Sequence, residues 1–299
     1  MLSLQIAHLS DPHLPLASLP SLREIRFKRL LSLLSWQLKR RHVHLAASLA
    51  TVMNDIRQHS PDLVALTGDL TNLGLQSEYE AATRWLEDQT LPPTLLVPGN
   101  HDALIREHFN TKSSLWTQWL RNEHGFPSVL QKEKVALIGL NSAVPTPPFF
   151  ASGRLSGKQL EALATTLRQC REEGLCRVVL IHHPPAPGLV KKRKALEHMD
   201  TLQTVLTQEG AELVLHGHSH RATLTCIPGT TIPVVGTTSA SHSAGDSDRT
   251  AGWNRVTITP DTDCWRISIQ RRELGVDGVM QNGFMHHFTP HRLSDAKAL

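Results

Sequence analysis

The chain has 299 residues, of which 40 % are hydrophobic, and it carries 31 basic against 27 acidic side chains for a formal net charge of +4. This length and apolar content are enough for a substantial core and exclude a disordered chain. The four cysteines form no C-x-x-C pair, which argues against both a disulfide framework and a structural zinc site.

No stretch of the sequence reaches the roughly 18 uncharged apolar residues that a membrane span needs. The first residues also lack the basic region, apolar run and cleavage site of a signal peptide. We therefore expect a cytoplasmic protein.

Short runs rich in Val, Ile and Leu alternate with helical patterns over the first two thirds of the chain, which predicts an α/β fold. The runs expected to be buried strands are Leu4–Leu9, Leu63–Thr67, Thr94–Val97, Val135–Leu140, Val178–Ile181 and Leu213–His216. The expected helices are Ala46–Gln58, Ser77–Asp88, Ser156–Cys170 and Met199–Gln208. After Gly217 the pattern changes to short β runs: Ala222–Cys226, Ile232–Gly236, Arg255–Thr259 and Trp265–Arg271.

We find no internal repeat and no interdomain linker. The expected organisation is a single domain over residues 1–275, with a helical insertion at residues 15–44 directly after the first strand and a loose tail at residues 276–299.

The insertion holds the whole positive excess of the chain. Between Ser21 and His44 there are seven basic residues and one acid, so the remainder, with 24 basic and 26 acidic residues, has a charge of −2. As a helix, the segment would carry two apolar stripes: Phe27, Leu31, Leu34 and Leu38, and then Leu22, Ile25, Leu33 and Trp36.

Three interpretations of this segment stay open. Residues 16–44 could contact an anionic membrane surface or a substrate acyl chain through the stripe flanked by Arg23, Arg26, Lys39, Arg40 and Arg41. They could instead form a buried cap with a solvated basic rim. Nucleic-acid binding is disfavoured, because the segment offers only Phe27 and Trp36 for base stacking.

Each expected strand of the α/β region is followed by side chains that can hold a metal. The motifs are Asp11-Pro-His13, Gly68-Asp69, Gly99-Asn-His-Asp102, His182-His-Pro-Pro185 and Gly217-His-Ser-His220. Ligands in open α/β sheets bind beyond the carboxyl ends of the strands, so these five ends would converge on one site. Mixed imidazole and oxygen ligands suit Mn, Fe, Zn or Co better than Mg or Ca.

The five motifs in this order resemble the signature of the calcineurin-like metallophosphoesterases, in particular the bacterial phosphodiesterase branch described as cyclic-AMP phosphodiesterase-like. The resemblance implies a four-layer αββα sandwich and a centre of two metal ions. Asp11, His13 and His220 would hold one metal, Asn100, His182 and His218 the other, and Asp69 would bridge them. His101 would be a catalytic proton donor without ligating a metal, and Asp102 could orient it; His183 is either supportive or structural.

The resemblance implies a phosphodiesterase in which a metal-bridging hydroxide attacks phosphorus, with a phosphodiester as substrate. The alternative is a pyrophosphate hydrolase acting on a lipid-linked nucleotide, similar to the UDP-2,3-diacylglucosamine hydrolases of the lipid A pathway, at the inner face of the membrane. A scaffold protein that has lost its site is a third reading, which the complete ligand set disfavours.

Overall fold

The first of two six-stranded sheets has the strand order β12-β11-β10-β1-β2-β3. Its strands are β1 (Leu4–Leu9), β2 (Leu63–Leu66), β3 (Thr94–Leu96), β10 (Gly252–Pro260), β11 (Trp265–Leu274) and β12 (Met280–Phe288). The computed structural model describes residues 3–105, 114–245 and 248–290. In this sheet β1, β2 and β3 run parallel, and β10 joins β1 in antiparallel register.

The second sheet has the order β4-β5-β6-β7-β9-β8, with β5, β6, β7 and β9 parallel. Its strands are β4 (Ser128–Lys132), β5 (Val135–Gly139), β6 (Cys176–Ile181), β7 (Leu213–His216), β8 (Thr223–Cys226) and β9 (Pro233–Gly236). The expected strands therefore form, within a few residues of their predicted bounds, and β4 is an additional edge strand.

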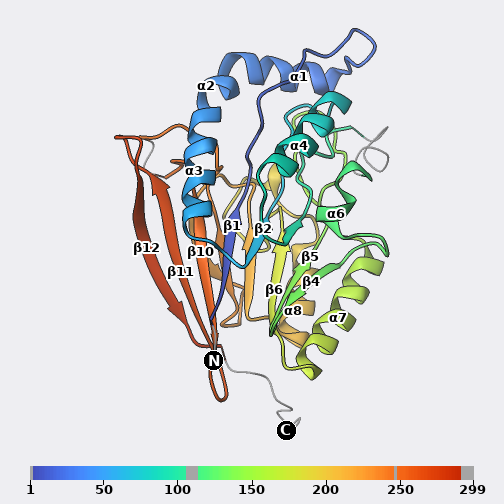
Figure 1. Ribbon diagram of the computed structural model, residues 1–299. Helices are drawn as coiled ribbons and strands as arrows, with labels where there is room; N and C mark the ends of the chain where they lie inside the picture. Colours follow the sequence, from blue (N-terminus) through green and yellow to red (C-terminus); the bar gives the residue numbers. More distant parts are fainter. Residues whose placement is uncertain (1–2, 106–113, 246–247, 291–299) are drawn as a thin grey trace.

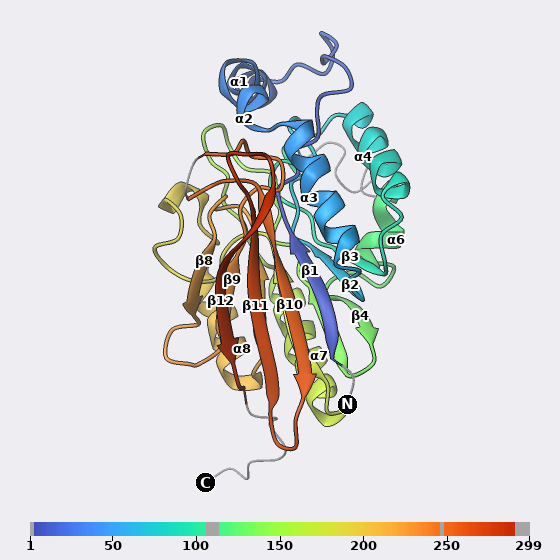
Figure 2. The ribbon, with the colours of Figure 1, turned by 60° about the vertical axis from the view of Figure 1, so that its left-hand side comes forward.

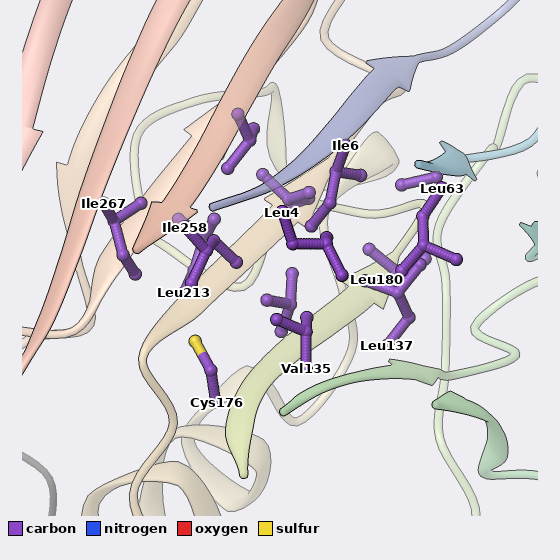
Figure 3. Close-up of a cluster of buried hydrophobic side chains, with 14 of the residues drawn as sticks. Leu4, Ile6, Leu63, Val135, Leu137, Cys176, Leu180, Leu213, Ile258 and Ile267 are labelled. Carbon is purple, nitrogen blue, oxygen red and sulfur yellow. The ribbon is translucent and has the colours of Figure 1, made fainter. Parts of the chain in front are cut away.

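The main core lies between the two sheets. Figure 3 shows Leu4, Ile6 and Leu63 of the first sheet facing Leu137 and Leu180 of the second, all of them buried. Strands such as β2, whose four residues are all buried, need the unbroken apolar run that the sequence provides, because both faces of the strand are covered.

Helices cover the two outer faces of the sandwich (Figures 1 and 2). Helices α3 (Ala46–Gln58) and α4 (Gln76–Asp88) pack on the first sheet, and α7 (Gly157–Glu172) and α8 (Met199–Glu209) on the second. Ser156 caps α7 as predicted, since its hydroxyl accepts a hydrogen bond from the Gln159 N–H at 3.2 Å. The predicted four-layer αββα fold is confirmed.

The segment after β1 forms helix α1 (Phe27–Ser35), a π-helix (Trp36–Arg40) and the short α2 (Arg41–Val43), which lie beyond one end of the sheets (Figure 1). Arg29 anchors α1, because its buried guanidinium donates hydrogen bonds to the carbonyls of Leu73 and Gly74. Leu22 and Ile25 precede α1, so the second apolar stripe does not lie on one helix as expected.

The shorter helical elements are α6 (Thr117–Leu120) and the 3₁₀ turns Ser114–Trp116 and Lys192–Lys194. The expectation of a loose tail from residue 276 is wrong for β12, which pairs with β11 along nearly its whole length; residues 291–299 lie outside the described residues. β12 escaped prediction because its sequence, Met-Gln-Asn-Gly-Phe-Met-His-His-Phe, shows no regular apolar alternation. None of the described helices is long and apolar enough to cross a bilayer.

Candidate metal centre

The carboxyl ends of β1, β2, β3, β6 and β7 meet at one edge of the sandwich and bring the five motifs together. The loops after β1 and β2 stay paired beyond the strands, with the Asp11 N–H donating to the Gly68 carbonyl at 2.9 Å and the His13 N–H to the Asp69 carbonyl at 3.0 Å. The second sheet joins through the His218 N–H, which donates to Asp11 Oδ2 at 3.1 Å.

Four of the expected ligands form a first group: Asp11, His13, Asp69 and His220. The Nε2 atoms of His13 and His220 lie 3.4 Å apart, and His220 Nε2 lies 3.0 Å from Asp11 Oδ1. His13 Nε2 is 3.8 Å from Asp69 Oδ2. Ligand atoms at this spacing are close enough to share one cation.

A second group consists of Asp69, His182 and His218, with Asn100 beside it. His182 Nε2 lies 3.4 Å from Asp69 Oδ2 and 3.3 Å from Asn100 Oδ1. Asp69 belongs to both groups, and the same oxygen, Oδ2, faces His13 in one and His182 in the other. A carboxylate in this place can bridge two ions.

Backbone carbonyls orient three of the imidazoles. Nδ1 of His13 lies 3.2 Å from the Thr71 carbonyl, Nδ1 of His182 lies 2.6 Å from the Thr67 carbonyl, and Nε2 of His218 lies 2.9 Å from the Lys194 carbonyl. A carbonyl only accepts, so the nitrogen beside it carries the proton and the other nitrogen keeps its lone pair for a metal.

The candidate ligands stand on strained backbone. Asp11, His13, Asp69, His218 and His220 all have positive φ values between 40° and 63°, a region that costs a non-glycine residue about 1–3 kcal/mol and that clusters at functional sites. Neighbouring glycines allow the close approach. A Cβ on Gly99 would lie 2.2 Å from Asp69 Oδ1, and one on Gly217 would lie 2.6 Å from Asp11 Oδ2.

The electrostatics of the cluster fit a cation. Asp11 Oδ1 is buried and accepts no hydrogen bond within the described part of the chain. Burial keeps the pKa values of His13 and His218 well below the usual range, so both rings are neutral, as metal ligands must be. At His182 burial works in the same direction, but the Asp69 carboxylate outweighs it and raises the pKa to about 9. Without an ion this ring therefore carries a proton on Nε2 beside Asp69, and a metal ion would have to displace that proton.

His101 lies beside both groups without joining them. Its backbone N–H donates to Asp69 Oδ1 at 2.7 Å, and its Nδ1 donates to the Asn72 carbonyl at 2.8 Å. Burial, with the nearby Arg40 charge second, lowers the pKa of the His101 imidazole to about 3. The ring is therefore neutral, with Nε2 as its hydrogen-bond acceptor.

The prediction that Asp102 orients the His101 ring is wrong. One oxygen of the buried Asp102 carboxylate accepts from the N–H groups of Asp69 and Gly99 at 2.9 Å, and the other from the Thr71 N–H at 3.0 Å. Burial, and next the Asp69 charge, raises the pKa of Asp102 to about 7. Asp102 holds the second and third motif loops together, so its position is structural.

His183 also has a supporting position. Its Nδ1 lies 2.8 Å from Ser142 Oγ and its Nε2 donates to the Ala151 carbonyl at 3.2 Å, which ties the loop after β5 to the fourth motif.

His44 is a neighbour of the site that sequence reasoning missed. It forms a further group of possible ligands with His13 and His220. His44 Nδ1 lies 3.1 Å from Ser239 Oγ and 3.0 Å from Ser241 Oγ. Where Nδ1 donates to one of these hydroxyls, Nε2 keeps its lone pair. His44 belongs to a His42-x-His44 pair with the spacing of His218-x-His220, but the pair follows no expected strand and we did not single it out.

A cavity of about 290 Å³ opens onto the cluster. One wall, the metal-facing wall, includes His13, Asp69, Asn100, His218 and His220. A second part of the lining, the insertion wall, consists of Lys28, Leu31, Ser32, Ser35 and Arg40. The rest of the lining includes Phe149, Phe150, Arg193 and Lys194. The insertion therefore lies against the candidate centre.

Solved structures share this architecture. A dimetal phosphatase from Danio rerio superimposes with a TM-score of 0.62 at 11 % identity, covering 97 % of this chain and 99 % of that one. A purple acid phosphatase from yellow lupin (Lupinus luteus) has the same TM-score at 14 % identity and covers 96 % of this chain and 54 % of its own. At these identities the likeness shows the fold alone.

Two curated relatives are similar in sequence. A probable cyclic nucleotide phosphodiesterase from Synechococcus sp. is 29 % identical over 224 residues, 74 % of this chain and 80 % of the relative. A probable glycerophosphodiester phosphodiesterase from Arcobacter nitrofigilis is 27 % identical over 168 residues, 56 % of this chain and 55 % of that protein. The family model of the calcineurin-like phosphoesterases matches residues 4–222. The prediction of a metal-dependent phosphoester hydrolase is thereby confirmed, and the chain belongs to the calcineurin-like phosphoesterase family.

Proposed function

We propose that the protein is a dinuclear metal phosphodiesterase that hydrolyses a small, water-soluble phosphodiester such as a cyclic nucleotide or a glycerophosphodiester. The observation that carries this proposal is the cavity itself, in which two ligand groups joined by Asp69 face four cationic side chains: Lys28, Arg40, Arg193 and Lys194. The printed names of both curated relatives describe phosphodiesterases and support the same substrate class.

In this proposal Asp11, His13 and His220 would hold one ion, Asn100, His182 and His218 the other, and Asp69 would be shared between them. Two divalent or trivalent ions, with Mn, Fe, Zn and Co as candidates, would supply an activated water and neutralise charge on the phosphoryl oxygens. Backbone carbonyls and glycine contacts hold the candidate ligands in place.

We keep the proposal that His101 acts beside the substrate without ligating a metal. Its Nδ1 proton is already used on the Asn72 carbonyl at 2.8 Å, so a proton given to the leaving oxygen would have to come from Nε2.

The lipid-linked pyrophosphate alternative is not favoured. The cavity of about 290 Å³ lies at the lower end of the range for small-molecule sites, which suits a small diester. Both relatives are also named for diesters without such chains.

A membrane partner for the outer face of the insertion stays part of the proposal, with a location at the inner face of the membrane. Leu22, Phe27 and Leu38 are 88 %, 62 % and 80 % exposed, and the cations Arg23, Lys39 and Arg41 are exposed on the same segment. Apolar side chains flanked by cations suit an anionic lipid surface.

The function is tested by assaying Mn-loaded and chelated protein on four substrates side by side. These are a cyclic nucleotide, a glycerophosphodiester, a phosphomonoester and UDP-diacylglucosamine. We expect metal-dependent turnover, with a diester at least about tenfold better in kcat/KM than the monoester, which corresponds to about 1.4 kcal/mol. Turnover of the UDP-diacylglucosamine alone would overturn the proposal.

A further inference from the structure

Arg40 is the side chain through which the insertion reaches the candidate centre. It is the last residue of the π-helix Trp36–Arg40, and it lines the same cavity as Asp69, Asn100 and His101. From the sequence, Arg40 and Arg41 belonged to the same group of cations beside the second apolar stripe. In the structure Arg41 is exposed beside His42, whereas Arg40 turns toward the metal-facing wall.

The hydrogen bonds of Arg40 hold its guanidinium at a defined place. Nη1 lies 3.1 Å from Nδ1 and 3.2 Å from Nε2 of His101. Because Nη1 is almost equally far from both ring nitrogens, it lies over the face of the imidazole and not in line with one lone pair, so His101 positions the guanidinium through its ring face. Nη2 donates to the Ser32 carbonyl at 2.9 Å, which fixes the other side of the fork.

The guanidinium of Arg40 interacts with the Asp69 and Glu78 carboxylates only from beyond ion-pair distance. Among the described residues no carboxylate forms an ion pair with it, and its Nε is buried without a hydrogen-bond partner. Buried charges in proteins are normally paired, because an uncompensated buried charge is costly. A guanidinium that has donors to spare and faces a cavity is suited to a planar, two-point contact with a phosphate.

We propose that Arg40 binds a non-bridging oxygen of the substrate phosphate and that His101 is its positioning residue. This inference rests on the proposed function, whose substrate it describes in more detail: the phosphate would be held between the metal ligands of the strands and one arginine of the insertion. The insertion thereby contributes a residue of the active site as well as a wall of its cavity.

The experiment compares metal-loaded parent with Arg40→Ala, Arg40→Lys and the matched control Arg41→Ala, whose side chain is exposed on the same segment. Inorganic phosphate is the binding probe, measured by calorimetry and as an inhibitor, and metal content is measured by elemental analysis. Hydrogen bonds to charged groups predict a loss of phosphate affinity of about 10- to 100-fold for Arg40→Ala, with Arg40→Lys between it and the parent. Arg41→Ala should match the parent.

Chemical rescue separates binding from a purely structural role. Free guanidinium at millimolar concentration should restore part of the phosphate affinity and of kcat/KM in Arg40→Ala and change neither in Arg41→Ala. If Arg40→Ala loses its metal ions, the phosphate affinity of Arg40→Lys decides whether Arg40 binds phosphate. Parent-like phosphate affinity in both Arg40 variants, or losses in them without rescue, would overturn the proposal. A parent that binds phosphate through Arg40 but cleaves no diester would overturn the proposed function alone.

Discussion

The two walls of the cavity are built in different ways. The metal-facing wall stands on strand ends that are buried on both sides, and its side chains are fixed by strained backbone, glycine contacts and carbonyl hydrogen bonds. The insertion wall belongs to a segment that is held by a few side chains, chiefly Arg29 and, through the Thr146 carbonyl, Lys28. We therefore expect the metal-facing wall to tolerate almost no substitution. The insertion wall can accept more sequence change, and its side chains can determine which substrate binds.

The largest effect should come from the residue shared by both metal groups. We expect Asp69→Ala to lose both ions and at least about 10³-fold in kcat/KM, because two cations contribute several kcal/mol to the transition state. Elemental analysis and a diester assay measure this, with the exposed Asp88→Ala as control. A variant that kept two ions per chain would show that Asp69 does not bridge them.

Gly99→Ala tests how closely the metal-facing wall is packed. The new Cβ would collide with the Asp69 carboxylate and backbone, at 2.2 and 2.6 Å, and displace the shared ligand. Displacement of about 1 Å can cost about 10²-fold in rate. Gly157→Ala is the control, since nothing lies within 4 Å of its Cβ position at the start of α7. Equal activities of the two variants would contradict the close-packing argument.

His44→Ala probes the place where the insertion returns to the first ligand group. If its Nε2 supports the ion held by His13 and His220, the affinity for that ion should fall about 10- to 100-fold, the usual cost of losing a supporting partner. Metal titration followed by calorimetry measures this. The exposed neighbour His42→Ala serves as control. Unchanged titration of both sites would remove His44 from the centre.

The smallest effect is expected on the outer face of the insertion. Replacing Arg23, Lys39 and Arg41 by Gln should weaken co-sedimentation with anionic vesicles about tenfold at low salt, since each cation adds at most about 1 kcal/mol and salt screens it. A variant with Lys134, Lys158 and Arg266 replaced has the same charge change elsewhere on the surface. A membrane partner would be excluded if both variants sedimented with anionic vesicles as well as the parent does. It would also be excluded if the parent bound anionic and neutral vesicles equally.

The strands and the convergence of the five motifs could be predicted from sequence because both have local signals. A fully buried strand such as β2 needs an apolar run, and a ligand at a strand end stands beside a glycine. Edge strands such as β4, whose burial alternates, carry a weaker signal. Arg40 had no such signal, and the His42-x-His44 pair stood away from any strand end, because the approach of both residues to the site depends on the path of some thirty residues after β1. Asp102 looked catalytic until its backbone partners were known.

The convergence of both sheets on one ion cluster has a consequence for folding. Asp11 belongs to the first sheet and His218 to the second, and 207 positions separate them in the chain. The site therefore forms only after nearly the whole chain has folded. An ion bound there would link the two sheets. By mass action, a free ion at 100 times its Kd would add about 2.7 kcal/mol to the free energy of unfolding, so chelation alone would loosen the entire sandwich.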